Sequence, residues 1–252
     1  MGRDFSETGL KAVVLAAGKG TRLQATDSDA PKVMREACGR PLLWYVLEAL
    51  SFIKKEDIIL VVGYKKEAIA DYFGGYILAE QAPQLGTGHA VMAARAGLEG
   101  FRGAVLVCYG DMPAIQRGTY EALIRVHFEQ GNDCTLLTGE SSVPLPYGRI
   151  LRSGDGEFLH VVEDKDCTPE QREIKELNSG VYVFRAAPLL EALNELKNDN
   201  TQGEYYLTDV PAIMRGRGAR IGVCRRDLGD EIIGVNTREQ LTQVEGILRG
   251  DH

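Results

Sequence analysis

Short runs of aliphatic and β-branched residues alternate with longer amphipathic segments along the first half of this chain. The runs at 11–16, 57–62 and 103–109 are continuous enough in Val, Ile and Leu to be strands covered on both faces. The segments between them have apolar residues at helical spacing: 41–53, 67–73 and 87–98. Strands that alternate with helices predict an α/β fold in which a mostly parallel sheet is flanked by helices.

The second half has a different pattern. Residues 147–164 predict a β-hairpin around Ser153–Gly156, because Gly and Asp tolerate the positive φ of tight turns. No repeat, low-complexity tract or Pro-, Gly- or Ser-rich linker divides the chain, so we expect one domain with an inserted β-rich lobe. The further expected elements are a strand at 179–184, a helix at 187–196, a strand at 219–225 and a last helix from Thr237.

Composition excludes several function classes. The 36 acidic residues outnumber the 29 basic ones and give a net charge of −7, so no basic surface for nucleic acid or an anionic membrane is indicated. The five cysteines are odd in number, widely spaced and without a C-x-x-C pair, which indicates neither a disulfide framework nor a zinc site. A reducing cytoplasm is the expected compartment. No apolar stretch has the length of a signal peptide or a membrane span.

The stretch VVLAAGKGTRLQATDSDAPK, residues 13–32, carries an apolar run directly into a glycine-rich turn with three cations. Gly18 and Gly20 permit a sharp turn with exposed N–H groups, and Lys19, Arg22 and Lys32 add charge where a phosphate chain would bind. The pattern is neither a Walker A loop nor a dinucleotide fingerprint, because the Lys-hydroxyl pair and the third glycine are missing. An ordinary βα turn with solvated cations is the alternative interpretation.

Asp111 directly follows the expected strand at 103–109, at the sheet edge where open α/β folds bind their ligands. A carboxylate there, with no cation nearby in the sequence, suits Mg²⁺, which prefers oxygen ligands and shares its coordination shell with phosphates and water. The alternative is a helix N-cap or a turn residue before Pro113.

Seven motifs resemble those of one family, in family order from about Leu10 to about Leu241. They are LAAGKGTR with PKVM, QAPQLGTGHA, YGDMP, YGRILR, VEDKDCTPEQREIKELNSGVYVF, NDNTQGEYYLTDV and GVNTREQL. The chain resembles the N-terminal uridylyltransferase domain of bacterial N-acetylglucosamine-1-phosphate uridylyltransferases. The resemblance implies a Rossmann-like nucleotide-diphospho-sugar transferase fold. It also implies the reaction of UTP with N-acetylglucosamine 1-phosphate to give UDP-N-acetylglucosamine and pyrophosphate.

The resemblance also implies roles for individual residues and parts of the chain. Within a single domain spanning 1–252, a nucleotide-binding half is expected at 10–135, a sugar-binding half at 136–236 and a C-terminal helix at 237–252. Arg22 and Lys32, with Lys19, are expected to neutralise the phosphates, and Asp111 and Asn236 to bind Mg²⁺. The expected nucleotide contacts are Leu15, Ala16, Ala17, Gly18, Lys19, Gln81, Gly86 and Thr87. Tyr109 and Gly110 are expected beside the nucleotide, and Gly148, Glu163 and Asn178 are expected to bind the sugar.

Several alternatives remain open at this stage. Gln84 competes with Gln81 for base recognition, and Asn236 also fits the N-cap of the last helix. Tyr205 and Tyr206 fit a core role or a substrate-contact role equally well. Another sugar phosphate or nucleotide, or a sugar-nucleotide sensor without catalysis, are the rival functions.

Two departures from the family pattern affect these expectations. The segment between Arg22 and Lys32 is longer than the family pattern, which leaves the reach of Lys32 open. The bifunctional family members continue into a hexapeptide-repeat acetyltransferase domain, whereas this sequence ends at His252, so acetyl transfer is not expected from it. Because that domain forms the trimer in the family, the oligomeric state is also open.

Overall fold

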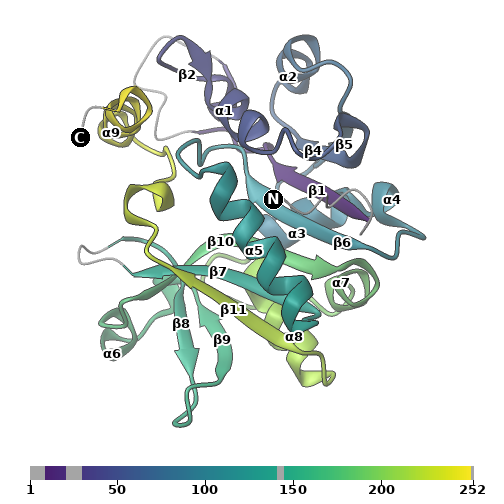
Figure 1. The fold of residues 1–252 in the computed structure, drawn as a ribbon, viewed down its shortest axis with the longest axis vertical. Helices are drawn as coiled ribbons and strands as arrows, with labels where there is room; N and C mark the ends of the chain where they lie inside the picture. The colour runs from purple at the N-terminus through teal and green to yellow at the C-terminus, as the bar shows by residue number, and fades with distance from the viewer. Residues whose placement is uncertain (1–8, 21–29, 141–144, 251–252) are drawn as a thin grey trace.

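The computed structural model describes residues 9–20, 30–140 and 145–250. Its centre is one mixed sheet with strand order β11-β7-β10-β6-β1-β4-β5, to which β8 and β9 are joined through β10 (Figure 1). The strands of this sheet are β1 (Leu10–Leu15), β4 (Ile58–Val62), β5 (Ile77–Glu80), β6 (Ala104–Tyr109), β7 (Cys134–Glu140), β8 (Arg149–Arg152), β9 (Phe158–Val162), β10 (Glu176–Arg185) and β11 (Ile221–Arg226). A separate small ribbon pairs β2 (Glu36–Ala37) with β3 (Arg40–Pro41).

The pairing confirms the mostly parallel sheet. Strand β1 runs parallel to both β4 and β6, β4 runs parallel to β5, and β11 runs parallel to β7. Strand β10 is antiparallel to β6 and β7 and inserts between them. The hairpin expected around Ser153–Gly156 joins β8 to β9, and Gly156 has the positive φ of +89° that the turn requires.

Helices cover both faces of the sheet (Figure 1). They are α1 (Leu42–Ala49), α2 (Lys66–Tyr72), α3 (Thr87–Ala93), α4 (Arg95–Leu98), α5 (Arg117–Gln130), α6 (Pro169–Arg172), α7 (Ala186–Leu193), α8 (Val210–Gly216) and α9 (Arg238–Arg249). None of the helices in the described ranges combines the length and the apolar composition needed to cross a bilayer.

The burial of β1 shows why its sequence is continuously apolar. Ala12 and Val14 belong to a core cluster shared with α1, α2 and α5, whereas Val13 and Leu15 belong to a second cluster shared with α3, α7 and α8. Both faces of the strand are therefore dry, as expected for a parallel strand between two helix layers. A third cluster lies under α9, where Val244 is fully buried.

The helix expected at 87–98 is wrong in one respect, because the chain forms two helices there. Helix α3 ends at Ala93 and α4 begins at Arg95, and Ala94 between them, with a ψ of −3°, is the C-cap of the first and the N-cap of the second. The new direction places Gly97 against β4, where an added Cβ would lie 2.6 Å from Ile59 Cδ1. Close packing of this glycine on the sheet accompanies the break.

Candidate active site

The carboxyl ends of β1 and β6 meet at the centre of the sheet. Leu15 pairs with Tyr109, and the N–H of Gly110 donates to the Leu15 carbonyl at 3.0 Å. The glycine-rich loop that follows Leu15 and the turn that contains Asp111 therefore lie at one edge. This is the edge at which open α/β sheets bind ligands.

Lys32 connects this edge to the end of the chain. Its Nζ donates to Asn236 Oδ1 at 2.6 Å and forms a close ion pair with the Asp111 carboxylate, which lies 79 positions away in sequence. The Lys32 and Asp111 side chains are only 11% and 18% exposed. The Val235 N–H donates to the Asp111 carbonyl at 2.9 Å and holds the last segment in place. Low exposure strengthens this charge pair relative to one in open water.

The glycine at position 20 makes room for this lysine. Gly20 has a φ of +65°, and an added Cβ would lie 2.8 Å from Lys32 Cβ. The backbone conformation and the close approach both require glycine. Gly18 and Lys19 are exposed on the same loop, and Lys19 does not line the cavity beside it. Arg22, for which phosphate neutralisation was predicted, lies outside the described residues.

The structure settles two local alternatives. Asp111 is not a helix N-cap, because α5 begins at Arg117 after the N-cap Gln116, but it does lie in a turn before Pro113, as the alternative also allowed. Asn236 is not the N-cap of α9 either, since Thr237 occupies that position and forms a capping box with Gln240. The side-chain oxygen of Asn236 is thereby free to face Lys32.

A cavity of about 200 Å³ opens at this edge of the sheet. Nine predicted site residues line it: Leu15, Ala17, Gly18, Lys32, Gln81, Gly86, Thr87, Tyr109 and Asp111. Ala16 and Gly110 are predicted site residues that do not line it. The Ala16 N–H donates to the Val61 carbonyl at 2.8 Å, so Ala16 serves the sheet. The remaining lining residues are Val33, Gln84, Ala90 and Glu204.

Both candidate carboxamides border this cavity. Gln81 is 5% exposed, and its Nε2 donates to the Gly86 carbonyl at 2.9 Å. The Gln84 Nε2 donates to the Ala17 carbonyl in a close contact. Gln81 also lies 3.3 Å from His89 Nδ1, which is consistent with the packing role expected of this histidine. Because a carboxamide offers a donor and an acceptor from either position, both stay candidates for base recognition.

Glu204 is a cavity residue that the sequence reasoning missed. It belongs to the motif NDNTQGEYYLTDV, in which only the two tyrosines were considered. Of these, Tyr206 is 5% exposed and its hydroxyl accepts from Gln202 Nε2 at 2.9 Å, which assigns it to the interior. Tyr205 is half-buried and its carbonyl accepts from Gly88 N–H at 2.7 Å. Glu204 directly precedes Tyr205 in this motif, and that position was the only indication of its role in the sequence.

The predicted sugar contacts lie outside the 200 Å³ cavity. The Gly148 carbonyl accepts from the Asn178 N–H at 2.8 Å, and Asn178 Nδ2 donates to the Tyr182 hydroxyl at 2.6 Å. Asn178 Oδ1 is buried and has no hydrogen-bond partner in the described part of the chain. Glu163 accepts a hydrogen bond from Thr208 at 2.8 Å, and burial raises the pKa of its carboxyl group.

Tyr109 links the two groups of residues. Burial raises the pKa of its hydroxyl, with smaller contributions from the Glu163 and Asp111 charges, while a hydrogen bond with Thr87 opposes the rise. Its ring packs on Gly180, where an added Cβ would lie 2.5 Å from Tyr109 Cε2. The tyrosine thus lies between the Asp111 side of the site and the Glu163 side.

The oxygen donors at Asp111 and Asn236 fit a hard divalent cation. A single ammonium nitrogen contacts one oxygen from each side chain, so both oxygens lie within reach of one cation. Through 9–20, 30–140 and 145–250, no group of three or more His, Cys, Asp or Glu residues is arranged to hold a metal. One carboxylate and one amide oxygen, completed by phosphate and water, is a ligand set that Mg²⁺ accepts.

Comparisons with known proteins agree with this geometry. The model of the MobA-like NTP transferase domain matches residues 12–209. Among solved structures, one described as a glucose-1-phosphate thymidylyltransferase from Bacillus anthracis shares the fold. Its TM-score is 0.72 at 17% identity, with 95% of each chain covered.

Curated relatives are closer in sequence. The Bifunctional protein GlmU of Pelotomaculum thermopropionicum is 43% identical over 95% of this chain and 52% of its own length. That of Acetivibrio thermocellus is 44% identical with the same coverage. The chain spans about half the length of the curated relatives it matches, and the resemblance predicted from the motifs is confirmed. With the model matched over residues 12–209, the chain belongs to the family of MobA-like NTP transferase domains.

Proposed function

We propose that this protein transfers UMP from UTP to N-acetylglucosamine 1-phosphate, forming UDP-N-acetylglucosamine and pyrophosphate. The observation that carries the proposal is the meeting of Lys32, Asp111 and Asn236 at the mouth of a glycine-rich loop. The 43% identity to the Bifunctional protein GlmU over nearly the whole chain supports it further. We also propose a cytoplasmic location, which the five free cysteines support.

The chemistry asks for positioning and charge neutralisation. The attacking oxygen belongs to a sugar phosphate that is already anionic, so no side chain has to remove a proton from it. Its bond to the UTP α-phosphorus forms as the bond to the pyrophosphate oxygen breaks, with the two oxygens in line. Lys32 neutralises charge on the phosphates from one side, and Arg22 and Lys19 are proposed to do so from the loop.

Asp111 and Asn236 would hold Mg²⁺, which supplies charge neutralisation to the phosphates when bound. The Asp111 carboxylate alone does not favour Mg²⁺ over the Lys32 ammonium, because the ammonium loses its water more easily than Mg²⁺ does. A second oxygen ligand is therefore needed. The side-chain amide of Asn236 adds an oxygen without adding charge, and the backbone N–H of Asn236 donates to Gln240 Oε1 at 2.7 Å. The chain therefore fixes the orientation of both donors through the last helix.

The two substrates occupy different parts of the site in this proposal. The backbone of 15–18 and a carboxamide from Gln81 or Gln84 bind the base, where the uracil edge needs one donor and one acceptor. The sugar lies toward Gly148, Glu163 and Asn178. The unpartnered buried oxygen of Asn178 offers an acceptor for the acetamido N–H, which explains why its lone pair is left without a protein donor.

The direct test is the release of pyrophosphate from UTP in Mg²⁺, measured with N-acetylglucosamine 1-phosphate and beside it with glucose 1-phosphate. The other nucleoside triphosphates, dTTP included, form the second axis of the panel. Release confined to the proposed pair supports the proposal. Release with another pair alone would keep the reaction class and replace the substrate, and tight nucleotide binding without release would identify a sensor.

Asp111→Asn tests the central residue. It keeps the shape of the side chain but removes the charge, so we expect kcat/KM to fall about 100-fold or more, in the range seen when one charge-stabilising group is lost. Asp71→Asn, on the exposed side of α2, is the matched control and should leave turnover unchanged. Wild-type turnover in Asp111→Asn would remove Asp111 from the mechanism.

A further inference from the structure

The second candidate site lies at one margin of the sheet, along β11. This strand is the last in the sheet order and pairs only with β7 among the described strands. The Arg220 carbonyl accepts from the N–H groups of Asp133 and Cys134 at 2.8 and 3.3 Å. Because backbone groups alternate along a strand, Gly222 and Cys224 also face β7, whereas Ile221, Val223 and Arg225 face outward.

These outward backbone groups are unpaired. No loop or turn in the described ranges gives or receives a backbone hydrogen bond at Ile221, Val223 or Arg225, and β7, on the other side of the strand, is the only described strand that pairs with β11. Free groups in a row at strand spacing are a template for pairing with another extended segment. The edge of β11 is therefore able to accept a further strand.

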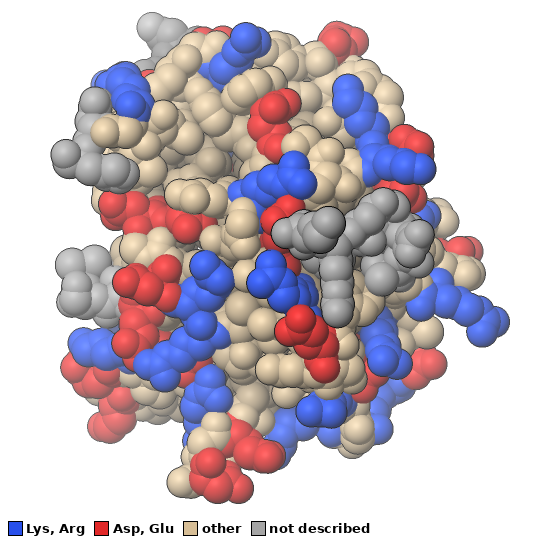
Figure 2. Space-filling view, in the orientation of Figure 1, with Lys and Arg blue, Asp and Glu red and all other residues tan. Residues whose placement is uncertain are grey.

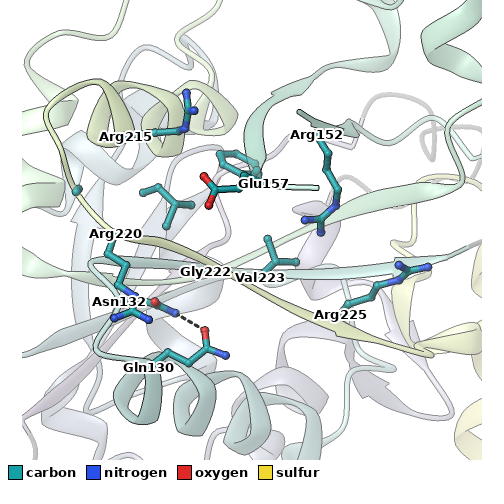
Figure 3. A pocket seen from close by; sticks show the side chains of 12 residues that line it. Gln130, Asn132, Arg152, Glu157, Arg215, Arg220, Gly222, Val223 and Arg225 are labelled. Atoms are coloured by element: carbon teal, nitrogen blue, oxygen red, sulfur yellow. Dashed lines mark hydrogen bonds between the residues drawn. The ribbon is translucent and has the colours of Figure 1, made fainter. Parts of the chain in front are cut away.

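A hollow of about 580 Å³ opens along this edge. The hairpin contributes Phe158, the end of α8 contributes Arg215, and the end of α5 contributes Gln130 (Figure 3). Ile221 and Val223 are half-buried and form part of its apolar lining. The hollow reaches both faces of the strand, since Arg215 and Arg152 lie on one side of β11 in this view and Asn132 and Gln130 on the other.

Gly222 and Asn132 close the hollow beneath the strand. Asn132 is 1% exposed, and its Nδ2 donates to Thr135 Oγ1 at 3.0 Å and to Gln130 Oε1 at 3.1 Å. An added Cβ at Gly222 would lie 1.9 Å from that nitrogen. The Asn132 side-chain amide therefore has room only because residue 222 is a glycine, and its hydrogen bonds fix it as one wall of the hollow.

The lining is positively charged although the whole chain is negative. Four arginines line the hollow against one carboxylate, Glu157: Arg152, Arg215, Arg220 and Arg225. Arg152 and Arg225 already pair with Glu176 and Glu140. No residue in the described ranges forms a hydrogen bond or an ion pair with the guanidinium group of Arg215 or Arg220, and only the backbone N–H of Arg220 donates, to Asp133. Arg215 lies near Asp155, whose pKa is lowered first by a hydrogen bond from Ser153 and to a smaller extent by the Arg215 charge. On this face, Lys and Arg gather over the lower half of the molecule with acidic side chains between them (Figure 2).

Arginines on an edge strand also keep identical edges apart. A second copy of β11 paired across a two-fold axis would bring the same arginines opposite one another, which like-charge repulsion disfavours. The same arginines would attract a strand that carries acidic side chains. Its alternating side chains would reach the cations on both faces, whereas a compact phosphate would contact one face only.

We propose that the open edge of β11 binds an extended acidic segment of a partner protein, which adds to the sheet as a further strand. The backbone of Ile221, Val223 and Arg225 supplies the hydrogen bonds. Arg215 and Arg220 recognise carboxylates on the two faces. This surface is separate from the cavity at Asp111, so the proposal does not depend on the proposed reaction.

Fluorescence anisotropy of a labelled eight-residue peptide that alternates Glu with Thr or Val tests the binding. We expect saturable binding to one site and its loss when Lys replaces Glu in the peptide. Arg215→Gln and Arg220→Gln should each weaken binding about tenfold, the loss expected for one charge-assisted hydrogen bond. Arg226→Gln is the matched control, because Arg226 is exposed on the same strand but does not line the hollow.

Two further arms separate strand pairing from charge attraction. Val223→Pro removes one outward N–H but none of the bonds to β7, and edge positions tolerate proline. We expect this variant to keep its unfolding transition and pyrophosphate release while losing the peptide. A peptide N-methylated at alternate positions keeps its charge and should not bind, and this arm uses the unaltered protein.

Four outcomes of the binding assays would overturn the proposal. They are no saturable binding of the acidic peptide, equal binding of the N-methylated peptide, an equal loss in Arg226→Gln, and displacement of the peptide by inorganic pyrophosphate at a similar concentration. The last would identify a small-anion site. Sedimentation of the protein alone would reveal pairing of two β11 edges, which would likewise refute an acidic partner.

Discussion

Of the two described glycines that line the active-site cavity, Gly18 and Gly86, only Gly86 has no room for an added methyl group. Its φ is +109°, a region that side chains rarely adopt, and an added Cβ would lie 2.6 Å from the Tyr205 carbonyl oxygen and 2.9 Å from the Tyr205 nitrogen. Backbone atoms cannot rotate away as a side chain can. Gly86→Ala therefore has to separate this turn from the segment around Tyr205.

The separation has a cost that follows from the contacts. Tyr205 N–H donates to the Leu85 carbonyl at 2.8 Å, and Gly88 N–H donates to the Tyr205 carbonyl at 2.7 Å. Losing both bonds costs about 2 kcal/mol at roughly 1 kcal/mol each. The φ of 109° with a ψ of 175° lies in a region that is essentially restricted to glycine, which adds about 1–3 kcal/mol. We expect Gly86→Ala to lower the free energy of unfolding by about 3–5 kcal/mol in total.

Gly100→Ala is the control for backbone strain alone. Gly100 has a φ of +73°, and no atom lies within 4 Å of its added Cβ, so we expect a loss of only about 1–2 kcal/mol. Urea unfolding of both variants with a common m-value gives the difference. Nucleotide binding should also weaken in Gly86→Ala, because Glu204 Cβ lies 2.9 Å from the added carbon and lines the cavity. Equal stability losses in the two variants would refute the argument from Tyr205.

Three other predictions concern titration and specificity. Burial lowers the pKa of His127 to about 4, so the unfolded chain takes up a proton that the fold excludes, and stability should fall as the pH drops from about 6.5 to 4. His127→Gln should flatten that decline in pH-dependent urea unfolding. Burial and the nearby Asp199 and Asp166 charges raise the pKa of Asp209 to about 6, so this group destabilises the fold increasingly from pH 4 to 6. Asp209→Asn should raise stability by about 1–2 kcal/mol at pH 7 and change nothing at pH 3, and an equal gain at both values would contradict this. If Gln81 reads uracil, Gln81→Met should reduce the preference for UTP over CTP in pyrophosphate release about tenfold, whereas Gln84→Met should not, and the reverse result would assign the role to Gln84.

The elements predicted best were those with both faces buried. Strands β1, β4 and β6 lie within a residue of their predicted bounds, because a continuous apolar run has few alternatives once helices cover both faces. Strand β5 received no prediction. Its apolar run, Ile77–Ala79, is only three residues long, and Ile77, Leu78 and Glu80 are exposed at the sheet edge, so neither a long apolar run nor an alternating pattern marks the strand.

The sequence predicted which residues belong to the candidate site, but not which of them contact one another. The residues around Gly18 and Asp111 follow two parallel strands, and topology alone brings them together. Asp111 has no cation near it in the sequence, but Lys32 reaches it in space across 79 positions. The longer segment before Lys32 did not prevent that contact. The spacing of residues in the sequence could not predict this ion pair. It forms where the end of the chain packs against the sheet, with Val235 bonded to the Asp111 carbonyl and Asn236 bonded to Lys32.

Strand β10 shows most clearly what the parallel pattern could not convey. It runs antiparallel to β6, with Tyr182 opposite Val107, so its first residues lie at the carboxyl end of β6. Asn178 therefore lies near Tyr109, at the sheet edge that holds the candidate site. A parallel strand would have placed it at the opposite edge. Gly180, at a φ of +81°, leaves room for the Tyr109 ring to pack directly against β10 at this point. The sugar-side residues thus join the nucleotide side because one strand reverses direction, and a reversed strand has the same apolar composition as a parallel one.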